Sequence, residues 1–244
     1  MINTIGIILE MIPYSESSWV LKLISWDKAQ ISVIAKGWRK KAEPLLRFVE
    51  YDFSLSEPRE EGLYILKDLA SLQDFSQYPA TSTWAAAEAG AELLARIMIP
   101  QPEAKQYYTL LRQYLAYLQN VDKNGILIFW RLMLRLFVIL GIDMKLDHCE
   151  RCQKDCRPAA QSPAGDLLCN KCHMELVGSN GYEALSPQAR SVLHRMPEIG
   201  RHLKSIALDK NTISEINKLF LNYFSSHHKQ TLKLKSLSVL SQFY

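Results

Sequence analysis

The sequence lacks a long uncharged hydrophobic run. Its longest apolar stretch, residues 126–142, contains Arg131 and Arg135, whereas a membrane-spanning helix needs about 20 predominantly apolar residues. The N-terminal residues, MINTIGIILEMIPYSE, show neither a basic segment ahead of an apolar run nor a small-residue cleavage site, so a secretory leader is not expected. We therefore expect a cytoplasmic protein without a membrane span.

Cysteine is scarce and confined to one place. The 244 residues include 5 cysteines, all of which lie between Cys149 and Cys172. An odd, clustered set is not a disulfide framework, because it cannot link distant parts of the chain.

Common catalytic signatures are also missing. The sequence contains no phosphate-cradling GxxxxGK[ST], no GxSxG and no HExxH. We therefore do not expect an enzyme. The remaining composition, with 48% hydrophobic residues, 22% charged residues and a net charge of +4, is typical of a folded globular protein.

The first seventy or so residues have the character of β-structure. Five runs rich in β-branched and aromatic side chains predict strands at residues 5–9, 19–24, 30–35, 49–55 and 63–66. In the fourth run the apolar positions alternate strictly, as in a strand with one buried face. Only a short connection separates the second run from the third, which favours a tight hairpin. This spacing predicts a five-stranded, partly open barrel of the oligonucleotide-binding (OB) type.

Beyond Pro79 the pattern becomes helical. Helices are predicted at residues 81–98, 102–119, 124–140, 186–194 and 212–228 from Ala-rich composition, three- and four-residue apolar spacing and terminating Pro or Gly. The helix at 124–140 is apolar nearly all round, which predicts that it lies at the centre of a helical domain. The fold class is therefore α+β with two domains, an OB barrel at 1–79 and a helical domain at 80–244.

The most specific motif is a pair of CxxC sequences. Cys149 and Cys152 are followed, after sixteen residues, by Cys169 and Cys172, which is the spacing of a zinc ribbon. Four thiolates fill the tetrahedral shell of Zn²⁺, so the metal is expected to be structural. We expect a zinc-ribbon insert at about 146–176.

Three further residues nearby leave alternatives open. Cys156, His148 and His173 can substitute as ligands or remain free, and the cysteines can also be reduced thiols without metal. A zinc-dependent enzyme needs an open coordination position, which four cysteines do not leave. We expect Cys156 to lie outside the ligand set.

A basic stretch follows the third predicted strand. Lys36, Trp38, Arg39, Lys40 and Lys41 place four cations and an indole within six positions. The cations suit phosphate contacts and the indole suits stacking on a base, without sequence readout. The alternative is a solvated loop with Trp38 packed against the barrel.

Two cations interrupt the apolar helix. Arg131 and Arg135 lie one helical turn apart, beside Leu, Phe and Trp side chains. Such an arrangement suits the carboxylate of an acidic peptide, with the apolar groups holding an aromatic side chain. Alternatively, both arginines face water or pair with nearby carboxylates such as that of Asp143.

Several motifs in this order resemble the bacterial DNA repair protein RecO family. They are residues 13–18 (PYSESS), 23–26 (LISW), 35–40 (AKGWRK), Leu-Gly at 140–141, the two CxxC pairs and residues 232–236 (LKLKS). The resemblance implies a nucleoid-associated protein with an OB domain, a helical domain and a zinc-ribbon insert. It also implies binding of single- and double-stranded DNA and annealing of complementary strands without nucleotide hydrolysis.

The resemblance further implies partners and roles. Members join RecR and the acidic C-terminal tail of single-strand binding protein, and they help to load RecA in the RecF pathway. By likeness, Lys36, Arg39, Lys40 and Lys41 fall on the DNA-binding stretch, and Arg131 falls where a tail carboxylate would bind, with Arg135 beside it. Trp38 stands where the family usually has a small residue. The alternative function is a protein-interaction scaffold with a structural zinc ribbon and no direct DNA role.

Overall fold

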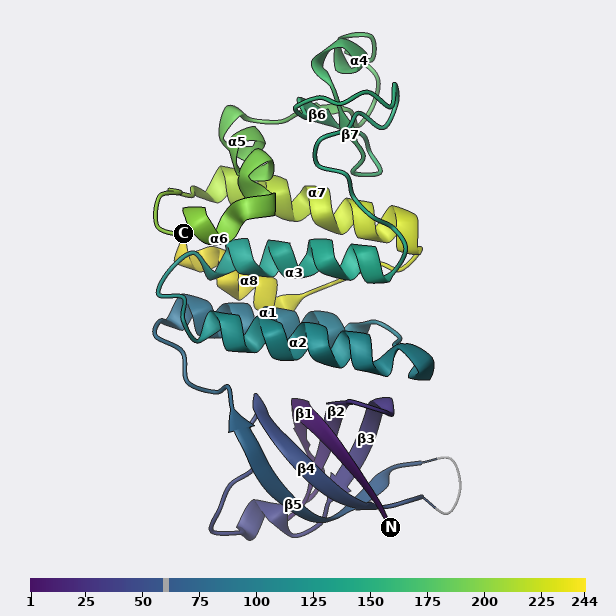
Figure 1. Cartoon of the computed structure of the whole chain (residues 1–244), viewed down its shortest axis with the longest axis vertical. Coiled ribbons are helices and arrows are strands. Elements are labelled where there is room, and N and C mark those ends of the chain that lie inside the picture. Colours follow the sequence, from purple (N-terminus) through teal and green to yellow (C-terminus); the bar gives the residue numbers. More distant parts are fainter. Residues whose placement is uncertain (59–61) are drawn as a thin grey trace. The chain divides into compact units, whose positions relative to one another are not determined.

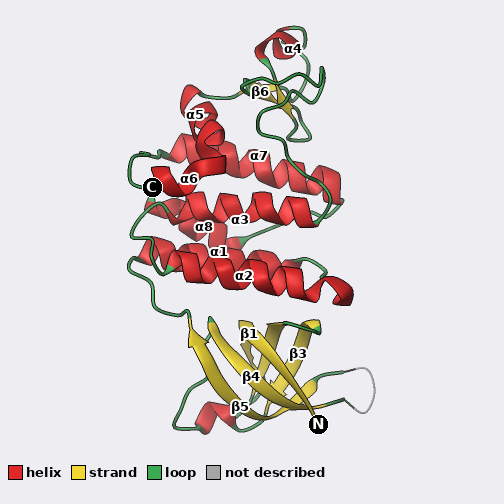
Figure 2. Cartoon of the chain, viewed as in Figure 1, coloured by secondary structure: helices red, strands yellow, loops and turns green. Residues whose placement is uncertain are grey.

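Two compact units, Met1–Asp122 and Lys123–Tyr244, make up the chain in a computed structural model that describes residues 1–58 and 62–244 (Figure 1). The first unit contains a β-barrel and two long helices, and the second contains the remaining helices and the cysteine segment (Figure 2). The fold class agrees with the α+β expectation. The domain boundary expected after residue 79 stays a prediction. Among the described residues, no helix combines the length and apolar character needed to cross a membrane.

The strands close into a barrel in the order β1-β2-β3-β5-β4. Their bounds are β1 (Ile2–Pro13), β2 (Trp19–Ser25), β3 (Ala29–Ala35), β4 (Val49–Ser56) and β5 (Tyr64–Asp74). All neighbours are antiparallel except β3 and β5, which pair in parallel over two residues each. The predicted five-stranded barrel is confirmed, and it is closed. Strand β5 continues well past the predicted end at residue 66, because its mostly exposed second half pairs with β4 as far as Val49 opposite Asp74.

The barrel core follows the alternation of β4. Tyr51, Phe53 and Leu55 are at most 4% exposed and pack inside the barrel, while Asp52 faces water. Glu50 lies on the face opposite to these apolar residues but is nevertheless only 7% exposed. Helix α2 (Ala104–Leu118) covers it there, because its Tyr108 and Arg112 both donate to the Glu50 carboxylate.

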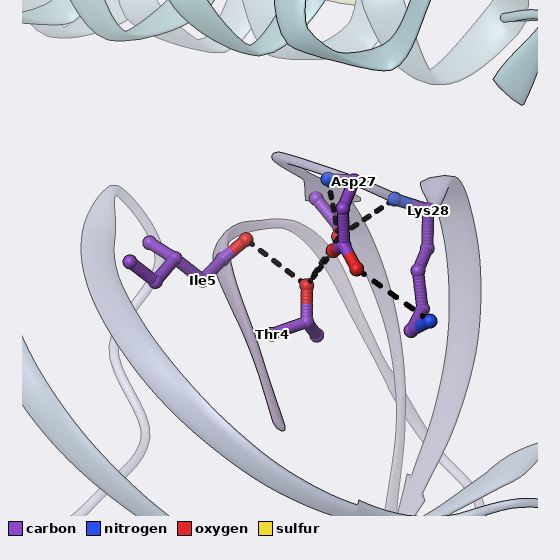
Figure 3. A network of polar contacts seen from close by, with 5 residues as sticks. Thr4, Ile5, Asp27 and Lys28 are labelled. Carbon is purple, nitrogen blue, oxygen red and sulfur yellow. Dashed lines mark hydrogen bonds and ion pairs between the residues drawn. The ribbon is translucent and has the colours of Figure 1, made fainter. Parts of the chain in front are cut away.

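A polar network fixes the hairpin between β2 and β3 (Figure 3). The hydroxyls of Thr4 and Ser25 lie 2.6 Å apart, and both donate to the carboxylate of Asp27. The backbone N–H of Lys28 donates to the Ser25 hydroxyl at 3.2 Å, so the turn is closed by side chains as well as by strand pairing. Although burial alone would raise it, these hydroxyl donors hold the pKa of Asp27 below its ordinary value.

Helices α1 (Thr81–Arg96) and α2 pack on one end of the barrel within the first unit. Besides Glu50, an ion pair of 2.7 Å joins Arg47, which precedes β4, to Glu88 of α1. Nε of Arg47 also donates to the carbonyl of Leu9 in β1. Arg47 thus links β1 to α1, and Glu50 links β4 to α2.

In the second unit, α3 (Gly125–Ile139) is buried over most of its surface, and its exposed positions, Arg135 and Val138, lie on one side. It packs with α6 (Ile199–His202) and α7 (Lys210–His228), and α5 (Pro187–Arg195) packs on α7. The unit also contains α8 (Lys235–Leu240); α6 and α8 were not predicted. The indole N–H of Trp130 donates to Asn217 of α7 at 2.8 Å, which satisfies the polar atom of a fully buried ring.

The cysteine segment follows α3 and precedes α5 along the chain, and it forms a separate lobe of the second unit (Figure 1). It holds a small sheet in the order β7-β6-β8, formed by β6 (Ala160–Gln161), β7 (Leu167–Leu168) and β8 (Glu183–Ala184), and a short helix α4 (Asn170–Met174). The lobe is attached to α7 at Gly165, whose φ is +83° and whose added Cβ would lie 2.6 Å from the backbone nitrogen of Tyr223. Only glycine fits there.

Candidate nucleic-acid interface and metal centre

The basic stretch forms a turn directly after β3. Gly37 adopts a φ of +79°, and the short helix η1 (Trp38–Lys40) follows it. In Figure 2 this short helix lies at the end of the barrel away from α1 and α2. The backbone N–H of Arg39 donates to the carbonyl of Ser17 at 3.0 Å, which ties the turn to the connection between β1 and β2.

Trp38 holds this turn from within. Its side chain is only 8% exposed and belongs to the barrel core, and the ammonium of Lys41 lies 3.2 Å from the centre of its ring. The ring is thus packed against the barrel, as one of our two alternatives for Trp38 expected. Stacking of Trp38 on a base would require the indole to leave the core, so we assign it the role of anchor.

The four cations of the turn are exposed. Lys36 and Lys40 are exposed, as is Lys41 beside the Trp38 ring, and in the described part of the chain no carboxylate pairs with these lysines or with Arg39. Arg39 is the most constrained, because its guanidinium donates to the carbonyl of Ser15 and lies 4.9 Å from the ring centre of Trp19. The turn therefore presents concentrated positive charge on a fixed backbone, which suits a phosphate chain.

The structure brings the four predicted cysteines together in the second unit. The sulfurs of Cys149, Cys152, Cys169 and Cys172 all lie within 4.8 Å of one another, so this cluster can hold a metal ion. Backbone geometry supports the arrangement, because the N–H of Cys172 points at Sγ of Cys169 at 3.4 Å. Two CxxC turns in one small lobe supply the four-thiolate donor set expected of a ribbon.

The pKa values of these thiols indicate that the four cannot ionise together without a bound cation. Burial opposes ionisation of Cys149, but hydrogen bonds from backbone N–H groups lower its pKa to about 6. Burial and hydrogen bonds to the neighbouring sulfurs raise the pKa of Cys172 to about 12. Four packed thiols cannot all carry charge by themselves. A divalent cation compensates that charge, so the donor set fits a metal ion.

The three additional candidate ligands, Cys156, His148 and His173, are not part of the group of four cysteines. Cys156 packs against the apolar cluster that contains Cys149 and Cys172. Burial together with the charges of Cys149, Cys169 and Cys152 raises its pKa to about 11. Both ring nitrogens of His148 face carboxylates, Asp147 at 2.6 Å and Asp155 at 2.8 Å.

Arg131 and Arg135 line one groove of about 440 Å³ in the second unit. Leu134 and the 60% exposed Val138 of α3 form an apolar wall with them. The opposite side comes from residues 143–147, which include the Asp143 already considered as a partner of the arginines, and from the end of α5 with the residues that follow it; among the lining residues are Met144, Leu193, Met196 and Pro197. Asp143 and Asp147 also line the groove, so it carries both signs of charge.

A closed five-stranded OB-type barrel, a helical unit and a four-cysteine lobe together define a class of multidomain protein. Comparison with known families gives the class its name. The profile described as "Recombination protein O N terminal" matches residues 1–75, and "Recombination protein O C terminal" matches residues 80–238. The chain belongs to the RecO family.

A relative that aligns over nearly the whole chain supports the same family assignment. The DNA repair protein RecO of Exiguobacterium sp. (strain ATCC BAA-1283 / AT1b) is 26% identical over 249 residues, covering 97% of this chain and 94% of that protein. Membership of the family places the chain in DNA repair and recombination.

Proposed function

We propose that this chain is a recombination mediator that binds single- and double-stranded DNA through its basic turn and anneals complementary strands. The observation that carries the proposal is the group of four exposed cations at Lys36, Arg39, Lys40 and Lys41, on a turn anchored by the buried Trp38. Family membership supports the same role.

Annealing follows from electrostatics without bond chemistry. Cations that neutralise phosphates release counterions and lower the repulsion between two backbones. A surface that holds both strands raises their effective concentration, so pairing becomes intramolecular in character. Base pairing then supplies the specificity, and the protein hydrolyses no nucleotide.

The groove of α3 is the site that we propose for the acidic C-terminal tail of single-strand binding protein. Arg131 and Arg135 would bind its carboxylates, while Leu134 and Val138 would contact its apolar side chains. With RecR, the protein would use this contact to reach coated single strands and help to load RecA. The resemblance to RecO supports these partners, and a role on chromosomal DNA would place the protein in the cytoplasm at the nucleoid.

We propose Zn²⁺ as the ion held by Cys149, Cys152, Cys169 and Cys172. Four thiolates are the donor set that Zn²⁺ prefers, and a shell of four leaves no position for a reacting water. The ion would hold together a lobe whose own sheet has only two residues in each strand.

Strand annealing tests the function. Complementary oligonucleotides coated with single-strand binding protein are mixed without ATP. Full-length single-strand binding protein is compared with a version that lacks its acidic tail. We expect rapid annealing that depends on the tail and is slowed at least tenfold by K40Q/K41Q. The matched pair K67Q/K123Q removes the same charge from exposed lysines outside the turn and should anneal normally. Absence of annealing and of DNA binding at low salt would favour a protein-only scaffold.

A further inference from the structure

The basic turn presents no exposed ring of its own, because Trp38 is buried. The neighbouring connection between β1 and β2 does present one. Tyr14, the first residue after β1, is 65% exposed, which makes it the most exposed aromatic side chain among the described residues. Among the described residues, none forms a hydrogen bond or a ring contact with the side chain of Tyr14.

The two turns form one surface. The carbonyls of Ser15 and Ser17 accept from the guanidinium and the backbone N–H of Arg39, respectively. The backbone N–H of Tyr14 donates to the carbonyl of Ser18 at 3.1 Å, which closes the connection at its base. Tyr14 is therefore held on a backbone that is bonded to the basic turn, while its ring stays in water.

Charge on this surface separates two regions. The basic turn carries the four cations, whereas the connection that holds Tyr14 carries the exposed carboxylate of Glu16. Phosphates are attracted to the first region and repelled from the second. A base is neutral and has an apolar face, so it is the part of a nucleotide that suits the region of Tyr14.

We propose that Tyr14 is a stacking platform for one unpaired base of a DNA strand whose phosphates contact the basic turn. The assignment rests on the proposed function, and it adds a preference for single strands. In a duplex the base faces are already stacked, so a duplex can use the cations but not the ring.

Binding of the full-length protein to a fluorescent deoxythymidine oligonucleotide and to a duplex of equal length tests the proposal. Stacking on one base contributes about 1–3 kcal/mol, which corresponds to about a 5- to 150-fold change in affinity. We expect Y14A to weaken single-strand binding by this factor, to leave duplex binding within about twofold and to leave the salt dependence unchanged. Y14F keeps the ring and should bind like the unaltered protein. Y117A removes a tyrosine exposed elsewhere on the first unit and serves as the matched control.

The outcomes separate two failures. If the unaltered protein binds no DNA at low salt, the proposed function and the platform both fall. If it binds DNA but Y14A is equivalent to it, or loses single-strand and duplex binding equally, only the platform falls.

Photocrosslinking gives a second test that needs no variant. An oligonucleotide carrying 5-iododeoxyuridine is crosslinked to the unaltered protein, and the modified residue is identified by mass spectrometry. A crosslink at Tyr14 supports the platform. Crosslinks confined to Trp19 or Trp38 would overturn it.

Discussion

Nε of Arg112 in α2 donates to the carboxylate of Glu50 in β4 at 2.8 Å. The hydroxyl of Tyr108 donates to the same carboxylate, which is almost fully buried. A buried charge without partners is costly, so this contact fixes the barrel to its helical pair. The basic turn at the other end of the barrel therefore extends from a rigid support.

Loss of the Arg112 side chain should destabilise the first unit. We expect R112A to lower its free energy of unfolding by about 2–3 kcal/mol, because Glu50 would stay buried with one charged partner fewer. Urea unfolding of the full chain measures this change. Arg201 and Glu198 form an exposed pair at 3.0 Å, and R201A should cost at most about 0.5 kcal/mol. Equal effects of both substitutions would contradict the role of the Glu50 contact.

Acid should weaken the hairpin network of Figure 3. Hydrogen bonds lower the pKa of Asp27 below its ordinary value of 3.8, so its stabilising contribution is complete above that value and is lost as the pH falls through the lower folded pKa. We expect T4V to cost about 1 kcal/mol at pH 7 and less at pH 3, measured by urea unfolding. S54A removes an exposed hydroxyl bonded to Asn3, and its effect should not depend on pH. A cost of T4V that is the same at both pH values would argue against the network.

Substitution of the cysteines should distinguish ligands from spectator. We expect C149S and C169S to abolish stoichiometric zinc, measured by elemental analysis of the purified protein, and to make residues 146–176 sensitive to protease. C156S should retain full zinc, because Cys156 lies outside the set of four. Zinc lost equally from C156S would show that the ligand set has been assigned wrongly.

The groove of α3 should bind an acidic peptide through Arg131. We expect R131A to weaken binding of a labelled tail peptide by about tenfold or more, since a charge-assisted hydrogen bond contributes about 1.5–3 kcal/mol. R201A removes an exposed arginine outside the groove and should bind normally. Titration by fluorescence anisotropy measures both. If R131A binds the peptide as tightly as the unaltered protein does, and high salt abolishes binding of both R131A and R201A, the peptide binds electrostatically at another site.

Local patterns in the sequence predicted most of the elements. Strict alternation identified β4, apolar composition all round identified α3, and CxxC spacing brought four sulfurs together. Each of these signals is carried by residues close together in the chain. The second half of β5 was not predicted because most of its side chains are exposed and its apolar residues do not alternate regularly; its pairing with β4 makes it a strand.

Features that depend on distant residues were not predictable in this way. Glu50 resembles an outward-facing position of an alternating strand, and nothing near it announces that α2 covers it. Trp38 beside four cations favoured stacking on DNA as much as burial, and only the closed barrel shows that the free protein buries the ring. Nothing in the sequence distinguishes Tyr14 from other residues that follow a strand. Only the hydrogen bonds of Arg39 show that the connection holding Tyr14 is joined to the basic turn.

The central claim is that the four cations of the turn bind DNA phosphates. The most direct measurement is the salt dependence of single-strand affinity for the unaltered protein and for K36Q/R39Q/K40Q/K41Q. Each lost phosphate contact should reduce the slope of log affinity against log salt concentration by about 0.7, so the variant should be shallower by about 3 and should bind much more weakly. An unaltered slope, or affinity of the unaltered protein that does not respond to salt, would contradict the account.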